Sequence, residues 1–244
     1  MDSIQKVRSL SIWIFIVPFL AINACLIIIT NFHDLFPNRE DVLVGFIFPY
    51  FDGGASISRT ARVFPTYLIF KPAMFLTAYL LIRYWLYNKT IVQNIYGDHK
   101  YIKKFLFFGI GSAACLILHS VFLGVKFDHN LYKLFRRVIM LVFILFEIAA
   151  QAYLVAALYS FREKLLKFIN KKILNVKIIL VSALIVVAII SIPIVSLPGD
   201  DFLGFNLKSF KHALEWDYFI GVISFYLLTF LMWKKLISRN PSST

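Results

Sequence analysis

Charge is scarce in this sequence, and negative charge is scarcest. Asp and Glu supply 13 of the 244 residues and Lys and Arg supply 26, so that 16% of the chain is charged while 60% is hydrophobic. A soluble domain needs a charged and polar coat around its core, and this composition cannot supply one. The sequence therefore excludes a soluble cytosolic enzyme and a disordered chain, and it indicates an integral membrane protein.

The basic excess does not indicate a nucleic-acid partner. The net charge is +13, but the basic residues flank apolar runs and form no stripe in which aromatic side chains alternate with them. We therefore expect membrane lipids as partners and no nucleic acid.

Cysteine is almost absent, and this limits the available chemistry. Cys25 and Cys115 both lie inside apolar runs, so the sequence holds no disulfide framework from which a compartment is evident. No His, Cys or acidic spacing resembles a zinc site, and we expect no metal and no cofactor. The adjacent pair Asp128-His129 suits a metal-binding or acid/base role, or a solvated loop.

Long apolar runs make up most of the chain. Each is close to the roughly 20 residues that cross a bilayer as a helix. They cover residues 10–30, 63–87, 105–125, 138–161, 178–197 and 216–233. The first run is too long for a signal peptide and lacks an A-x-A cleavage site, so we expect it to remain as a span. The predicted fold is all-α: one polytopic domain over residues 1–244, a six-helix transmembrane bundle with a long first outer loop.

The distribution of Lys and Arg predicts the orientation. Sixteen of them lie in the N-terminus, the second and fourth loops with their flanks, and the C-terminal tail, against nine on the opposite side. The positive-inside rule then places both termini and the loop from Arg162 to Lys177 in the cytosol. Most acidic residues lie on the other side. A functional face is expected there, on an endomembrane or the plasma membrane.

Five polar residues interrupt the apolar runs, and such residues usually face the interior of a bundle. They are Asn23, Lys71, His119, Glu147 and Gln151. Counted along their helices, the first three lie at a similar depth near the outer side, with the last two beneath them. We expect one cavity in the outer half, because few polar residues lie beyond Gln151. The structural alternative is that Lys71 snorkels, His119 bonds to a carbonyl and Glu147 joins helices.

Two acidic residues open the sixth run. Glu215 and Asp217 point roughly 200° apart on a helix, so they cannot both face one cavity. Trp216 between them suits an anchor at the membrane interface. We expect Glu215 to share the polar site with His119, and Asp217 to be peripheral.

Four segments carry a resemblance to a known family. They are Phe48-Pro49-Tyr50-Phe51-Asp52-Gly53-Gly54-Ala55-Ser56-Ile57-Ser58, then Phe64-Pro65 with Lys71-Pro72, Lys126-Phe127-Asp128-His129-Asn130 and Leu214-Glu215-Trp216. Together they resemble the six-span superfamily that groups the damage-regulated autophagy modulators (DRAM) with the post-GPI-attachment factors. The resemblance implies lipid handling at the non-cytosolic leaflet, such as remodelling of GPI-anchor lipid, with GPI-anchored proteins or glycolipids as partners.

The resemblance also suggests roles for individual residues. Ser56 and Ser58 would contact the lipid headgroup, with Lys71 and Asp128 as further headgroup candidates, while Glu215 would orient the site. His119 or His129 would act as hydrogen-bond donor or base. Whether a bond is broken stays open.

Two other functions compete with lipid handling. One is a small transporter or channel in which Lys71, His119 and Glu147 carry protons or ions. The other is a membrane scaffold without a site, acting in autophagy or lipid asymmetry, whose basic fourth loop binds anionic lipid.

Overall fold

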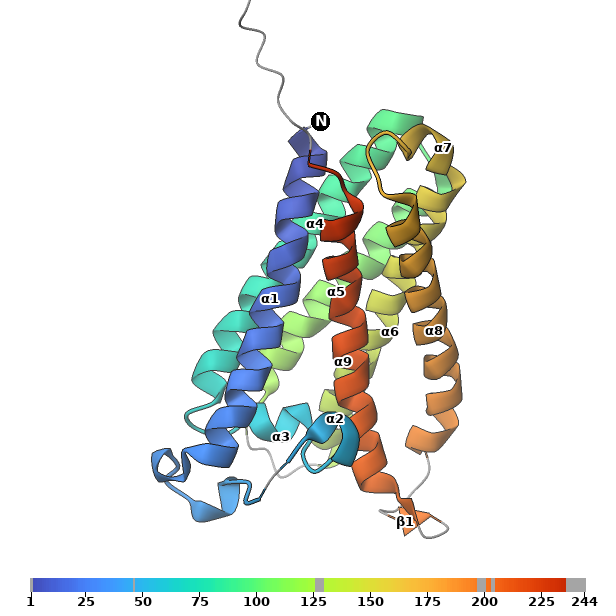
Figure 1. Ribbon diagram of the computed structural model, residues 1–244. Helices are drawn as coiled ribbons and strands as arrows, with labels where there is room; N and C mark the ends of the chain where they lie inside the picture. The colour runs from blue at the N-terminus through green and yellow to red at the C-terminus, as the bar shows by residue number, and fades with distance from the viewer. Residues whose placement is uncertain (1, 46, 126–129, 197–200, 203–204, 236–244) are drawn as a thin grey trace, which may run out of the picture.

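The protein is a bundle of long helices (Figure 1). The computed structural model describes residues 2–45, 47–125, 130–196, 201–202 and 205–235. The long helices are α1 (Asp2–Asn31), α4 (Tyr67–Tyr96), α5 (Lys100–Phe122), α6 (Asn130–Ser160), α8 (Lys171–Ser196) and α9 (Leu207–Met232). The short elements are η1 (His33–Leu35), η2 (Arg39–Asp41), α2 (Pro49–Asp52), α3 (Ile57–Ala61), α7 (Arg162–Leu165), β1 (Asp201–Phe202) and β2 (Phe205–Asn206).

The long helices close into a ring in the order of the chain. α1 packs on α4, α4 on α5, α5 on α6, α6 on α8, α8 on α9, and α9 returns to α1. Their inward faces form the main hydrophobic core, in which Trp85, Phe105, Trp216 and Phe225 are fully buried. A polar side chain that points into this ring is enclosed by the long helices. The interior of the ring is therefore where a candidate site is sought.

Five helices are long and apolar enough to cross a membrane: α1, α5, α6 (from Leu134), α8 (to Ser191) and α9. The chain is therefore a multi-span, all-α membrane protein. The predicted second span, residues 63–87, is the helix α4, which is as long as α1 but carries Lys71, Arg83 and Lys89. α4 is less apolar than the other long helices. Length and composition therefore support five spans, and a crossing by α4 is proposed below.

The helices extend beyond the predicted apolar runs, mostly at their polar ends. The run 216–233 belongs to a helix that already begins at Leu207, and the run 138–161 to one that begins at Asn130. Hydropathy marks the part that suits hydrocarbon, whereas backbone hydrogen bonding continues into the flanking polar sequence. Pro18, Pro72 and Pro193 lie inside helices, as expected.

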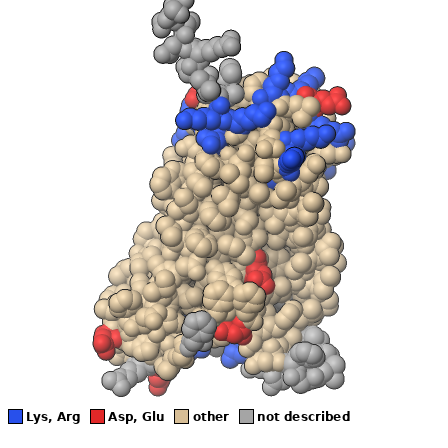
Figure 2. All heavy atoms as spheres, in the orientation of Figure 1, with Lys and Arg blue, Asp and Glu red and all other residues tan. Residues whose placement is uncertain are grey.

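The two ends of the bundle differ in charge (Figure 2). Lys and Arg gather over the end where α1 begins and α7 lies, which we call the basic end. The opposite end carries α2, α3 and β1, and we call it the first-loop end. The Arg8 guanidinium lies 4.2 Å from the Phe230 ring centroid, so α1 begins where α9 finishes.

The first loop folds back onto the bundle. Gly53 closes α2 with a left-handed backbone (φ 58°), and a Cβ there would lie 1.8 Å from the Ser209 carbonyl oxygen of α9. The Trp216 indole donates a hydrogen bond of 2.8 Å to the Ala55 carbonyl and packs edge-on against Tyr50 at 5.0 Å. The expectation that Trp216 anchors at the membrane interface is wrong: its side chain is fully buried and ties the loop to α9.

Candidate functional site

A small cavity lies inside the ring towards the first-loop end. Its volume is about 70 Å³, room for a few water molecules, and its walls come from α1, α3, α4, α5, α6 and α9. Most of the lining is apolar, with residues such as Ile14, Phe70 and Met74. Three ionisable candidates from the sequence line it together: His119, Glu147 and Glu215.

Glu147 is the best-buried carboxylate of this cavity, with 1% of its surface exposed. Ser112 of α5 donates to it at 2.5 Å, Gln151 donates at 3.2 Å from one turn further along α6, and the Tyr226 hydroxyl of α9 donates a third hydrogen bond. Burial of a carboxyl group requires such partners. Glu147 thus joins three helices, which matches the structural alternative as well as a functional role.

His119 lies in the last turn of α5 and is almost completely buried. Its Nδ1 atom has no hydrogen-bond partner within the described part of the chain. Arg136 of α6 acts on it electrostatically, and the Nε atom of Arg136 is likewise buried without a partner. Buried polar atoms are normally paired, so each of these two atoms can take a further hydrogen-bond partner.

Glu215 connects the sixth helix of the ring to the first loop. The backbone N–H groups of Ile57 and Ser58, which begin α3, donate hydrogen bonds to its carboxylate. Ser56, the residue before α3, caps the same turn by accepting a bond of 3.1 Å from the Arg59 N–H. The Ser56 side chain therefore stabilises the start of α3 in the first loop. Asp217 is exposed on α9 and does not line the cavity.

Three arginines lie close to one another beside α3. Arg136 donates to the Ser58 hydroxyl at 3.3 Å. Desolvation, and then the nearby Arg136 and Arg59, lower the pKa of Arg62, while Asp41 acts in the opposite direction. Within the described residues no carboxylate forms an ion pair with any of the three arginines. We call Arg59, Arg62 and Arg136 the arginine cluster.

The remaining sequence candidates lie elsewhere. The Asn23 side chain bonds to the Phe19 carbonyl and the Tyr50 hydroxyl, and the Lys71 amine bonds to the Val121 carbonyl at 3.3 Å. Neither lines the cavity. Asp128 and His129 lie outside the described residues.

Polar side chains continue from Gln151 to the basic end. Tyr84, Asn88, Thr229 and Lys177 are all buried there. The expectation that few polar residues lie beyond Gln151 is therefore wrong. Lys177, counted with the fourth loop, lies inside α8 and is fully buried. Hydropathy missed it because Lys177 directly precedes the apolar run, and only the packing of α8 on α9 encloses it.

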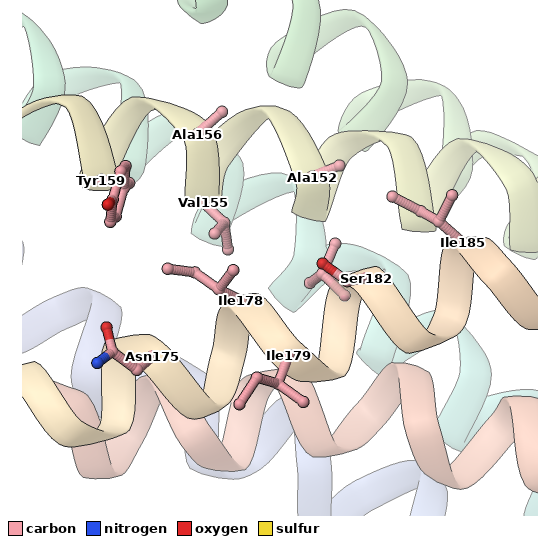
Figure 3. A pocket seen from close by; sticks show the side chains of 10 residues that line it. Ala152, Val155, Ala156, Tyr159, Asn175, Ile178, Ile179, Ser182 and Ile185 are labelled. Atoms are coloured by element: carbon pink, nitrogen blue, oxygen red, sulfur yellow. The ribbon is translucent and has the colours of Figure 1, made fainter.

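A second hollow of about 510 Å³ runs between α6 and α8 (Figure 3). Ala152, Ala156, Val155, Ile178 and Ile185 give it apolar walls, and Asn175, Ser182 and Tyr159 are its polar residues. It contains no acid, base or cation. The groove has the character of a surface that hydrocarbon chains cover.

The central cavity combines a histidine, two carboxyl groups and space for water. This set can hold or move a proton and donate hydrogen bonds to an anionic group at the rim. Across the described ranges no three His, Cys, Asp or Glu side chains gather as metal ligands. Arg136 and Tyr226 were not predicted as site residues. Arg136 flanks an apolar run and Tyr226 lies within one, and the sequence does not show which side of its helix faces the cavity.

Comparison with protein-family models, with curated proteins and with solved structures finds no match to this chain.

Proposed function

We propose that this protein binds a phosphate-bearing lipid headgroup at the first-loop end and takes part in lipid remodelling there. The observation that carries the proposal is the arginine cluster, which no described carboxylate neutralises by an ion pair. Ile57 and Met140 line the cavity. Ser58 directly follows Ile57, and its partner Arg136 lies one helical turn before Met140. We therefore place the arginine cluster at the rim of the cavity.

The chemistry of the cluster suits phosphate. Guanidinium groups bind phosphate oxygens through paired, charge-assisted hydrogen bonds. Among the described residues, the Nε–H of Arg136 and the Nδ1 of His119 are buried without a partner. A cavity of about 70 Å³ is too small for acyl chains, so the tails remain in the bilayer and only the headgroup reaches the rim.

The proposal includes a topology. We place α4 across the membrane as a sixth span, with both termini in the cytosol and the first-loop end at the non-cytosolic leaflet of an endomembrane or the plasma membrane. The contact of Arg8 with Phe230 supports an even number of crossings. The gathering of Lys and Arg at the basic end supports this orientation.

We also propose that the chain belongs with the DRAM and post-GPI-attachment superfamily, and that its lipid is a glycerophospholipid or a glycolipid such as the lipid part of a GPI anchor. Two segments of the resemblance meet in space, since Glu215 accepts hydrogen bonds from the backbone of Ile57 and Ser58. This contact supports a shared role for the first loop and the start of α9. GPI-anchored proteins would then be partners.

The test is a lipid-resolved mass spectrum of the gently purified protein. Wild-type protein is expected to retain one class of phosphate-bearing lipid, and Arg136→Gln to lose it. Arg137→Gln is the matched control, because Arg137 is the next residue of α6 and is exposed. Equal retention by the two variants, or lipid in wild type that only mirrors the bulk membrane, contradicts the proposal.

A further inference from the structure

The groove between α6 and α8 is large because small side chains line it. Ala152 and Ala156 line it from α6 and Ser182 from α8, and its volume is about 510 Å³. This volume lies within the range of roughly 300–1,000 Å³ that small-molecule sites occupy. The groove is open to the outside, since Ile179 and Ile185 in its lining are exposed. An occupant can therefore enter it directly from the surrounding bilayer.

The length of the groove matches one leaflet of a membrane. From Asn175 to Ile185 the helix α8 rises by about 15 Å, at roughly 1.5 Å per residue. Half of a hydrocarbon core of about 30 Å has the same length. The walls along this length include Val155, Ile178 and Val181 and are mostly apolar. One acyl chain therefore fits the groove in both length and polarity.

One end of the groove lies towards the basic end of the bundle. Figure 3 shows Tyr159 and Asn175 at this end and Ile185 at the other. The Arg162 guanidinium lies 4.4 Å from the Tyr159 ring centroid. Lys171 precedes Asn175 by four residues in α8, so the two lie on the same face of that helix. An anionic headgroup at this end of the groove would therefore meet two cations.

These two cations are not neutralised by the described part of the protein. No described carboxylate forms an ion pair with Arg162 or Lys171. Lys171 and Asn175 are both exposed, and the Asn175 amide can donate a hydrogen bond to a phosphate or ester oxygen. Charge complementarity therefore favours an anionic lipid over a zwitterionic one, whose own cationic group would lie near the same two cations.

A second copy of this chain is a poorer occupant of the groove. Copies that cross a membrane in the same orientation present their basic ends on the same side. Arg162 and Lys171 of one copy would then approach the basic end of the other, and like charges oppose association at an interface.

We propose that the groove binds one acyl chain of an anionic glycerophospholipid from the leaflet at the basic end, with the lipid phosphate at Arg162 and Lys171. The site lies at the opposite end of the bundle from the arginine cluster and does not depend on it. The bound chain covers the exposed seam between α6 and α8. Because the groove is open, its lipid exchanges with the bilayer, and the site is tested in membranes.

Photo-crosslinking in proteoliposomes of the full chain tests the proposal. The probes are phosphatidylserine and phosphatidylcholine with the same diazirine-labelled acyl chain, and peptide mass spectrometry locates the adducts. Phosphatidylserine is expected to label the groove residues more densely than the open face of α8 at Ile189 and Ile190, which are both exposed. It should label the groove about fivefold or more above phosphatidylcholine, because each cation near the membrane surface contributes a factor of about five.

Two variants that fill the groove should remove this excess labelling. They are Ala156→Phe and Ser182→Phe. Ser182 is exposed, so the second variant keeps the test decisive if the first does not fold. Ala183→Phe is the matched control, because Ala183 is an exposed residue of the same helix that does not line the groove.

A charge variant tests the headgroup contacts. Arg162→Gln combined with Lys171→Gln should lower labelling by phosphatidylserine to the level of phosphatidylcholine. Lys164→Gln combined with Lys167→Gln is the control of equal charge and should keep the difference. The Lys164 amine lies 4.6 Å from the ring centroid of Tyr96 of α4, a helix that does not line the groove.

The outcomes separate this site from the headgroup site at the first-loop end. Arg136→Gln should leave labelling of the groove unchanged, so each proposal can fail without the other. Equal labelling of the groove by the two lipids overturns the proposal, as does labelling no denser than that of the open face of α8. Undiminished labelling in both Ala156→Phe and Ser182→Phe also overturns it.

Discussion

Glu215 carries out two tasks with one carboxylate, since it holds the start of α3 and lines the cavity. Glu215→Gln keeps an oxygen that accepts from the backbone but removes the charge. We expect normal membrane abundance with loss of function. Asp217→Asn should be mild, because Asp217 is exposed and outside the cavity. Complementation of cells that lack the protein, with abundance measured in parallel, checks both, and full rescue by Glu215→Gln would remove the functional role.

His119 is the second residue for which a large effect is expected. His119→Ala removes the imidazole that lines the cavity and leaves Arg136 with one fewer neighbour. The expected result is loss of function at normal abundance, like that of Glu215→Gln. The same complementation assay applies. Normal function of His119→Ala would leave the arginine cluster to bind headgroups without it.

Among the elements, α2 depends on a glycine at its end. Gly53→Ala places a Cβ in a left-handed position and against the Ser209 carbonyl of α9. Gly97→Ala at the end of α4 is the matched control, because φ is +73° there and nothing lies within 4 Å. The control should cost roughly 1–3 kcal/mol, because φ +73° with ψ −151° is a backbone conformation that glycine alone readily adopts. Gly53→Ala should cost clearly more, seen as a lower unfolding temperature in detergent, and equal losses would show that α2 moves freely off α9.

The connection from α7 to α8 is rich in lysine. Lys164, Lys167 and Lys172 lie in it or directly beside it, and each can contribute on the order of 1 kcal/mol of attraction to anionic lipid. Replacing them and Lys171 with Gln should weaken binding to vesicles that contain phosphatidylserine. Activity at the first-loop end should remain. Loss of that activity with topology preserved contradicts this division between the two ends.

At the scale of the whole molecule, the orientation is the prediction with the widest consequences. A single cysteine in place of Lys167, in a background where Cys25 and Cys115 are replaced, should not react with an impermeant reagent added outside intact cells. For an endomembrane location, sealed microsomes replace cells, and the cysteine should then react from the cytosolic side. The opposite labelling pattern reverses the orientation and moves the proposed headgroup site to the cytosolic leaflet.

The sequence alone determined the class of molecule and the rough position of its helices. Apolar length and the need to satisfy backbone hydrogen bonds inside a bilayer are local properties, so runs such as 105–125 and 178–197 correspond to α5 and α8. The depth of His119 and Glu147 follows from counting along a helix, and both line one cavity with Glu215. The exact helix ends could not be predicted, because polar flanking residues continue a helix without a hydropathy signal. The run 63–87 was predicted to be a span, but α4 carries Lys71, Arg83 and Lys89 and is less apolar than the other five long helices.

Only the tertiary structure decided which polar residues meet. Rotation of each helix about its axis depends on packing with its neighbours, and a single sequence does not encode that rotation locally. The ring therefore turns Lys71 and Asn23 away from the cavity, encloses Lys177 beside Thr229, and brings Arg136 to Ser58 from the first loop. Trp216 is buried for the same reason, because the loop that contains Ala55 closes over it. These contacts join residues far apart in the chain, and they exist only once the helices have assembled.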